Sequence, residues 1–145
     1  MSRDTEPSLE NPILTYDEQV QVSRAVIALL DDWQVSANDQ IRLLALPANT
    51  KPRQLRRYYE NKPLPDEPEI WSRVEHLVGI ADALRTSYPH SAQGGAIWMN
   101  RVNYRFGDRT PIVAMVEDGL AGILAVRMHL DCAYDWHVDA NAPLR

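Results

Sequence analysis

Helical periodicity constrains this chain more than any other feature of its sequence. Apolar residues recur three and four positions apart, and alternation of polar and apolar residues never persists beyond four or five positions. That spacing is typical of helices that bury one face, whereas a half-buried strand requires alternation. Helix-start signals accompany the pattern, at Thr15 with Glu18 and at Thr110 with Pro111. We therefore predict an all-α protein, a compact bundle of about seven or eight helices.

The expected helices lie on either side of a proline-rich segment. Residues 62–68 (KPLPDEP) contain three prolines, which disfavour continuation of a helix. We expect an N-terminal module over residues 13–62 and a C-terminal helical domain over residues 66–136, which begins at a cap on Asp66. Residues 1–12 are expected to form a flexible tail and residues 137–145 a second tail. The predicted helices cover residues 15–33, 36–46, 50–61, 69–88, 94–102, 110–118 and 120–136.

Composition narrows the class of protein. The 145 residues are 45% apolar, which is enough for a folded core in one domain or in one domain with a small module. Cys132 is the only cysteine, so a disulfide framework and a thiolate-rich zinc site are excluded. No apolar run approaches the roughly 18 residues that cross a bilayer, and the polar, acidic N-terminus does not read as a secretory signal. We expect a cytoplasmic protein without a membrane partner.

The sequence contains none of the residue spacings that are typical of enzyme active sites. The four histidines share no metal-binding spacing, and the glycines match no phosphate-binding loop. His129 and His137, with Asp135 and Asp139, can be imagined as metal ligands, but a solvated helix end explains them better. No local signature of a nucleophile is present. We expect no catalytic activity, no cofactor and no metal.

A short basic segment stands out in a chain whose net charge is −5. Residues 51–62 carry five cations against Glu60 alone, a local charge of +4, whereas residues 1–35 carry −5. At 100° per residue, Arg53, Arg56 and Arg57 lie on one side of a helix. The opposite side is apolar and carries Leu55, Tyr58 and Tyr59. The segment is either an ordinary solvated helix face or a face that meets a polyanion.

The preceding residues favour the second interpretation. A short helix that ends near Leu46, a turn of about four residues and the basic helix together have the dimensions of a helix-turn-helix, although the turn lacks the usual glycine. In that motif the second helix enters the major groove, where Arg and Gln read base edges. We predict that Thr50, Arg53, Gln54 and Arg57 face the groove, and that Lys51, Arg56 and Lys62 contact phosphates. Two-fold dimerisation is expected if the target is an operator.

Three downstream segments resemble the Xre/MbcA/ParS antitoxin family. They are HLVGIADAL (residues 76–84), WMNRVNYRFGDRTP (98–111) and GLAGILAVRMHLD (119–131). The second is the most specific, with Asp108 where the family commonly has a second glycine, and the resemblance covers roughly residues 13–135. We expect its distinctive residues to hold a loop and start a helix rather than to touch a partner; they are Trp98, Asn103, Phe106, Gly107, Thr110 and Pro111.

The resemblance implies a function with two halves. Members of the family join a helix-turn-helix-like module, which represses their own operon, to a helical domain that neutralises a RES-type, NAD-consuming toxin. It implies a homodimer or a larger hetero-oligomer with the toxin. On this basis the toxin contact is expected on the last helix and tail, at Arg127, Asp131, Tyr134, Trp136 and Arg145. The alternative is a helical protein-interaction module that does not bind DNA.

Overall fold

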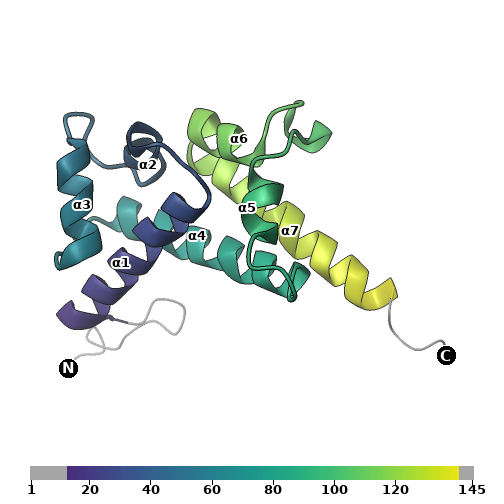
Figure 1. Ribbon diagram of the computed structural model, residues 1–145, viewed down its shortest axis with the longest axis horizontal. Coiled ribbons are helices and arrows are strands. Elements are labelled where there is room, and N and C mark those ends of the chain that lie inside the picture. Colours follow the sequence, from purple (N-terminus) through teal and green to yellow (C-terminus); the bar gives the residue numbers. More distant parts are fainter. Residues whose placement is uncertain (1–12, 141–145) are drawn as a thin grey trace, which may run out of the picture.

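Seven α-helices and one 3-10 turn make up residues 13–140 in the computed structural model, which describes side chains from Ile13 to Cys132 (Figure 1). Within these residues there is no strand, only an isolated bridge between Asn103 and Arg109. The all-α prediction is therefore confirmed, and no helix in this part of the chain is both long and apolar enough to span a membrane. The elements are α1 (Tyr16–Asp32), α2 (Ala37–Leu43), α3 (Pro52–Glu60), α4 (Pro68–Ser87), α5 (Gly94–Met99), η2 (Tyr104–Phe106), α6 (Pro111–Asp118) and α7 (Leu120–Ala140).

Helices α1 and α2 end in the same way. In each case the residue after the helix cap has a left-handed backbone, with φ of 65° at Gln34 and 59° at Ala45. The N–H of Val35 then donates to the carbonyl of Leu30, and the N–H of Leu46 donates to the carbonyl of Ile41, both at 3.0 Å. These are Schellman closures built without glycine, and each buries the hydrophobic residue that follows it.

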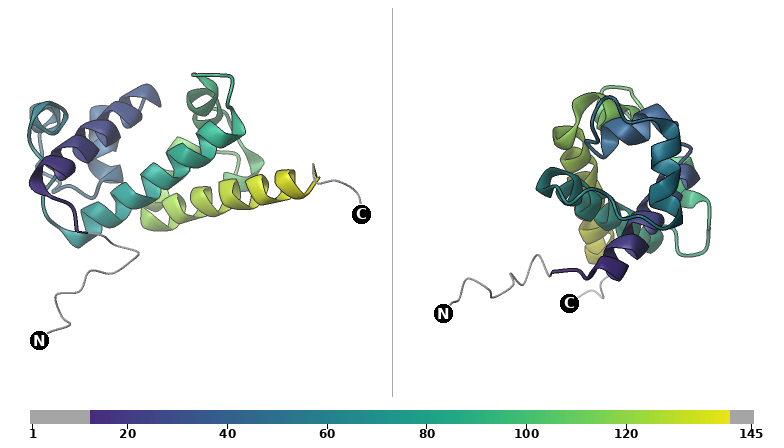
Figure 2. Two further views of the ribbon diagram at one scale, coloured as in Figure 1. Left: turned by 90° about the horizontal axis from the view of Figure 1, so that it is seen from below. Right: turned by 90° about the vertical axis from the view of Figure 1, so that its left-hand side faces the viewer.

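Helices α4 and α7 lie side by side and form the long axis of the molecule, with α1 crossing α4 and α6 folding back along α7 (Figure 2). Their buried faces join those of α1, α2 and α3 in one continuous hydrophobic core. The proline-rich segment is part of it: Leu64 is buried, and its N–H donates to the buried hydroxyl of Ser23 at 2.8 Å. The two predicted parts of the chain thus share one core.

Two glycines determine how α6 and α7 meet. Gly119 has φ of 67° and ψ of −139°, a backbone conformation that is open essentially to glycine alone, and it ends α6 as the sequence predicted. A Cβ on Gly122 would lie 2.3 Å from the carbonyl oxygen of Ala114. The two helices therefore pack backbone to backbone at this point.

Four predicted boundaries were wrong. Helix α5 ends at Met99 instead of Val102. Helix α2 ends at Leu43 instead of near Leu46, because the left-handed Ala45 closes it early. Helix α4 begins at Pro68 with Glu67 in the cap position and no side-chain cap bond, so Asp66 does not start it. Helix α7 continues to Ala140, past the expected start of the tail at residue 137, since neither glycine nor proline interrupts residues 123–142.

Candidate functional site

The basic residues predicted to bind DNA lie on α3 and directly before and after it, at one end of the molecule (Figure 1). Only Leu55 of this helix is fully buried, and it anchors α3 against α1 and α2. The cationic side chains around it are exposed and form no ion pair with a carboxylate in residues 13–132; they are Lys51, Arg53, Arg56, Arg57 and Lys62. The structure thus presents all five predicted cations to solvent.

Arg24 of α1 belongs to the same surface, which the sequence did not indicate. Its Nε donates to the carbonyl oxygen of Tyr59 at 2.9 Å, and its Nη2 donates to the carbonyl oxygen of Glu60. These carbonyls end α3 and have no partner inside the helix. Arg24 therefore holds α3 in place and adds a sixth cation, which we include in the basic face (Arg24, Lys51, Arg53, Arg56, Arg57 and Lys62).

Two of the predicted groove residues also have local structural roles. The side-chain oxygen of Gln54 accepts a hydrogen bond from the N–H of Lys51 at 2.6 Å, which caps the first turn of α3. Thr50 is half-buried, and its N–H donates to the carbonyl of Pro47 at 2.9 Å. Gln54 can therefore offer only its amide N–H groups to a ligand while this cap is in place.

The predicted apolar edge of α3 is partly wrong. Leu55 is buried and Tyr58 is half-buried, which raises the pKa of the Tyr58 hydroxyl through desolvation. Tyr59, in contrast, is 38% exposed, and the guanidinium of Arg56 lies 5.2 Å from the centre of its ring. Tyr59 lies in the last turn of α3, where Arg24 binds the backbone and the ring points out beside the cations.

The connection between α2 and α3 is longer than predicted. The expected turn had about four residues, but α2 ends at Leu43 and α3 begins at Pro52, which leaves the eight residues 44–51. The early closure of α2 at Ala45 accounts for most of the difference. Helix α3 packs mainly on α1 and less on α2. The pair is therefore looser than a standard helix-turn-helix with a turn of three or four residues.

Three aromatic rings anchor the loop of the family-like motif to α7. Trp98 stacks on His129 with ring centres 6.0 Å apart, and Phe106 meets both rings edge-on at 6.2 and 5.6 Å. Burial lowers the pKa of His129 from its ordinary value of 6.5, and the nearby charge of Arg105 adds to this effect. The imidazole is thus held as a neutral member of the aromatic cluster.

The remaining motif residues make contacts within the loop and at the start of α6. The side chain of Asn103 accepts from the N–H of Arg105 at 2.9 Å, Gly107 has φ of 72°, and the hydroxyl of Thr110 accepts from the N–H of Val113 at 3.1 Å. Pro111 occupies the first turn of α6. These groups are used within the chain, which fits a structural role for the motif.

Arg109 closes this loop, and no sequence signal identified it. Its Nη2 lies 2.8 Å from Asp118 and its Nη1 lies 3.1 Å from both Asp118 and Glu117, while its Nε donates to the carbonyl of Phe106 at 2.7 Å. The hydrogen bond with Arg109 lowers the pKa of Asp118, and the same contacts raise that of Arg109. The loop and the end of α6 are therefore joined.

Only two of the five residues expected to contact a toxin are described. The Nη1 of Arg127 lies 2.9 Å from Nδ1 of His76, and its guanidinium rests on Gly79 of α4, so this side chain faces its own chain. Asp131 is exposed, 4.0 Å from the Nε of Arg127. The side chains of Tyr134 and Trp136, and the whole of Arg145, lie outside the described residues.

Part of the exposed face of α7 is apolar. Beside the exposed Asp131, it carries five residues that were not among the predicted contact residues: Ala121, Leu124, Ala125, Met128 and Cys132. The sequence shows that these positions are apolar, but a second set of positions on the same helix is apolar too. Only the structure shows that the second set, Ile123, Val126 and Leu130, faces the core and that the first set is exposed.

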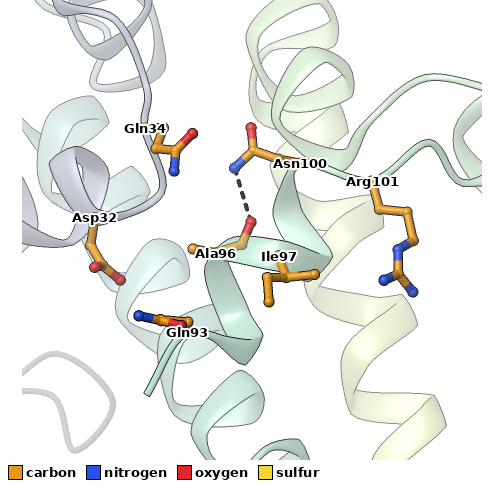
Figure 3. A pocket seen from close by; sticks show the side chains of 7 residues that line it. All are labelled: Asp32, Gln34, Gln93, Ala96, Ile97, Asn100 and Arg101. Carbon is orange, nitrogen blue, oxygen red and sulfur yellow. Dashed lines mark hydrogen bonds between the residues drawn. The ribbon is translucent and has the colours of Figure 1, made fainter. Parts of the chain in front are cut away.

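An open hollow of about 640 Å³ lies between the end of α1 and α5. Its two charged side chains, Asp32 and Arg101, lie on opposite sides of it, and Asn100 is bonded to the carbonyl of Ala96 (Figure 3). No histidine, cysteine or serine lines it. In the part of the chain that the structure describes, no three metal-ligating side chains converge. The hollow therefore brings no pair of ionisable side chains together.

Comparisons with known proteins add no assignment. Neither a protein-family model nor a curated protein matches this sequence. The functional argument therefore rests on the basic face and on the motif of residues 98–111.

Proposed function

We propose that this protein is a cytoplasmic, non-enzymatic antitoxin that represses its own operon by binding DNA and neutralises a RES-type, NAD-consuming toxin by binding it. The basic face carries the DNA-binding half of the proposal. The resemblance of residues 76–84, 98–111 and 119–131 to the Xre/MbcA/ParS antitoxins supports the toxin-binding half.

The basic face suits a polyanion because its charges are available. A surface cation that is already paired gains little from a phosphate, whereas the six cations here have no carboxylate partner in the described residues. The remainder of the chain is acidic, because the whole chain has a net charge of −5 even with the six cations of the basic face included. Repulsion from that remainder would orient DNA toward α3 alone.

The arrangement of side chains suggests how the contact is divided. We assign Arg53 and Arg57 to base edges, with the amide N–H groups of Gln54 beside them and Thr50 at the start of the helix. Lys51, Arg56 and Lys62 extend from the flanks and suit phosphates. Because Arg24 and the Gln54 cap fix α3 before binding, little ordering is required on contact with DNA.

The toxin-binding half has a different support. Residues 98–111 form a closed loop that is held against α7 by Trp98, Phe106 and His129. Such a loop provides a rigid frame for the end of α7, where we place the toxin contact, over residues 127–145, without the side chain of Arg127, which faces α4. The alternative function is a protein-interaction module that uses this domain and does not bind DNA.

A mobility-shift assay with the DNA upstream of the protein's own gene separates the two functions. Binding through the basic face should weaken steeply between about 50 and about 200 mM salt, because several phosphate contacts release counterions. Arg53→Ala and Arg57→Ala should each reduce specific binding by about 1–3 kcal/mol. Arg85→Ala is the matched control, an exposed arginine on α4 that already pairs with Asp82. If the variant with both Arg53→Ala and Arg57→Ala shifts DNA as well as the unaltered protein does, the basic face does not bind DNA specifically. The protein-interaction module would then be the better description.

The toxin half is tested by co-expression with the product of the neighbouring gene. If that product is a RES-type toxin, the full chain should restore growth, and truncation after Tyr134 should abolish the rescue. Full rescue by the truncated chain would move the contact away from the end of α7. A neighbouring gene product that is not toxic would remove the support for this half.

A further inference from the structure

The loop between α5 and α6 exposes two large side chains next to each other. Tyr104 is 75% exposed and Val102 is 62% exposed. Asn103 between them has an extended backbone, with φ of −136° and ψ of 122°. In an extended chain, side chains two positions apart leave the backbone on the same side. An aromatic and an aliphatic side chain therefore share one outer face of the loop.

Two arginines flank this pair. Arg101 and Arg105 are exposed, and neither forms an ion pair with a carboxylate in residues 13–132. The guanidinium of Arg105 lies 5.5 Å from the centre of the Tyr104 ring, a cation–π contact that favours one orientation of both side chains. We call these four residues the loop face (Arg101, Val102, Tyr104 and Arg105).

We propose that the loop face anchors the toxin contact, and that the toxin surface that receives it is an apolar recess for Tyr104 bordered by carboxylates. The proposal rests on the toxin-binding half of the proposed function and deepens it. It names the residues that contribute most to binding and the chemistry of the partner's surface.

The backbone beneath the loop face is already fixed in the free chain. The N–H of Asn103 donates to the carbonyl of Arg109 at 3.0 Å. The side chain of Arg109 in turn bonds to the carbonyl of Phe106 and to the carboxylate of Asp118. A loop held in this way requires little ordering when a partner binds, so most of the contact energy appears as affinity.

The loop face also lies beside the part of α7 where the proposed contact begins. The ring of Phe106 is 5.6 Å from the ring of His129, which falls inside residues 127–145. The end of one helix is small beside the roughly 800 Å² that each partner of a stable complex usually buries. The loop face extends that surface without a break in the chain's own packing.

The composition of the loop face indicates a protein partner with an acidic surface. Tyrosine and arginine are enriched among the residues that dominate the binding energy of protein interfaces. Residues 101–108 carry two cations against Asp108, in a chain whose net charge is −5. A local excess of positive charge on an acidic protein favours a partner surface of the opposite sign.

Other classes of partner fit the loop face less well. A duplex contact uses several phosphates at once, whereas the loop face has two cations, and the loop, drawn to the right of α6 in Figure 1, lies on the opposite side of the molecule from the basic face on α3. A membrane-surface contact buries the apolar face of a whole helix. The loop offers two apolar side chains only.

The first test measures the dissociation constant between the chain and the purified product of the neighbouring gene by biolayer interferometry. Tyr104→Ala should weaken binding at least about 30-fold, as expected for the central residue of an interface. Tyr16→Ala is the matched control, because Tyr16 is 63% exposed but lies on α1, and it should bind as the unaltered chain does. Far-UV circular dichroism of both variants should be unchanged, since both side chains are exposed.

The same measurement tests the charge of the partner's surface. Arg101→Ala and Arg105→Ala should each slow association and reduce its dependence on salt, because attraction to carboxylates speeds encounter. Arg85→Ala, an exposed arginine on α4, should change neither property. Association rates that stay unchanged in both loop variants would overturn the acidic recess.

The second test detects the contact without relying on affinity. Val102→Cys is combined with Cys132→Ser, which removes the exposed natural cysteine, and the new thiol is alkylated with iodoacetamide. Addition of the neighbouring gene product in excess should slow alkylation at least about tenfold, because the centre of an interface excludes solvent. Tyr16→Cys with Cys132→Ser is the control and should react at the same rate with and without the partner.

The outcomes separate this proposal from the proposed function. If the neighbouring gene product binds the unaltered chain but Tyr104→Ala binds equally well, or the thiol at position 102 is not protected, the loop proposal is overturned and the toxin-binding function stands. If the product does not bind the unaltered chain, both are overturned. If the loop variants lose binding while truncation after Tyr134 has no effect, the loop proposal holds and the contact at the end of α7 does not.

Discussion

Arg24 in the middle of α1 donates hydrogen bonds to the carbonyl oxygens of Tyr59 and Glu60, the first at 2.9 Å, across 35 positions of sequence. The last carbonyls of a helix lack intrahelical partners, and a cation beside them also complements the helix dipole. The position of α3, and with it the direction of the basic face, therefore depends on a side chain of another helix.

We expect Arg24→Gln to lower the free energy of unfolding by about 1 kcal/mol, because exposed charge-assisted bonds at the end of α3 are lost. Urea denaturation measures this change. Arg24→Lys keeps the charge but cannot make both bonds. The loss in the free energy of unfolding should therefore be nearly as large for Arg24→Lys as for Arg24→Gln, whereas Arg24→Lys should bind DNA more tightly than Arg24→Gln. Equal stability of all three proteins would show that the contact does not support α3.

Ala45→Gly should stabilise the protein by about 1 kcal/mol. Ala45 has φ of 59°, and a residue with a Cβ pays a steric penalty in this region that glycine does not pay. Ala28→Gly is the control, since Ala28 is exposed inside α1 and the same chemical change there should cost about 1 kcal/mol. Urea midpoints of the two variants should move in opposite directions, and a loss of stability in both would contradict the strain at Ala45.

Gly122→Ala should cost about 2–3 kcal/mol or prevent folding, because its Cβ would lie 2.3 Å from the backbone oxygen of Ala114, which cannot move away without separating α6 from α7. Gly79→Ala provides the comparison. There the Cβ would meet the end of the Arg127 side chain at 2.6 Å, and that side chain can turn aside. The gain in helix propensity then offsets the loss, so its thermal midpoint should change by less than about 4 °C.

Stability should fall as the pH drops through about 6.5, because His129 is neutral in the aromatic cluster and has a lowered pKa in the folded state. Above the pKa of the histidine in the unfolded chain, both states are neutral and the protein has its full stability. As the pH falls below that pKa, the unfolded chain takes up a proton before the folded protein does, so unfolding becomes more favourable. His129→Gln should flatten the dependence of the urea midpoint between about pH 7 and about pH 5. Arg105→Gln should raise the pKa of His129 in an NMR titration; an unchanged value would leave burial as its only cause.

The local structure followed largely from the sequence. Thr15 forms the predicted capping box with Glu18 at the start of α1. The hydroxyls of Ser36 and Thr110 cap α2 and α6, and Gly119 separates α6 from α7. These signals act over three or four residues, so they can be read without knowledge of the fold. Asp66 failed as a cap because Pro68 begins α4 with the neighbouring residue in the cap position.

The candidate sites divide in the same way. The clustering of cations at residues 51–62 and their exclusion from the buried edge of α3 were visible in the sequence, because amphipathic spacing is a local property. The contribution of Arg24, the inward turn of Arg127 onto Gly79 and the exposure of Met128 were not visible. Each depends on which helix packs beside another.

By itself, the sequence determined that the chain is helical, where most helices start and which short segment concentrates positive charge, because hydrogen bonds and spacing within one turn decide these properties. Only the tertiary structure decided which of two apolar faces of α7 is buried and which polar side chains are already used. Helix α7 has Val126 on one face and Met128 on the other, and α4 and α6 can cover only the first. That choice depends on backbone contact at Gly122, where two helices approach more closely than any side chain would permit.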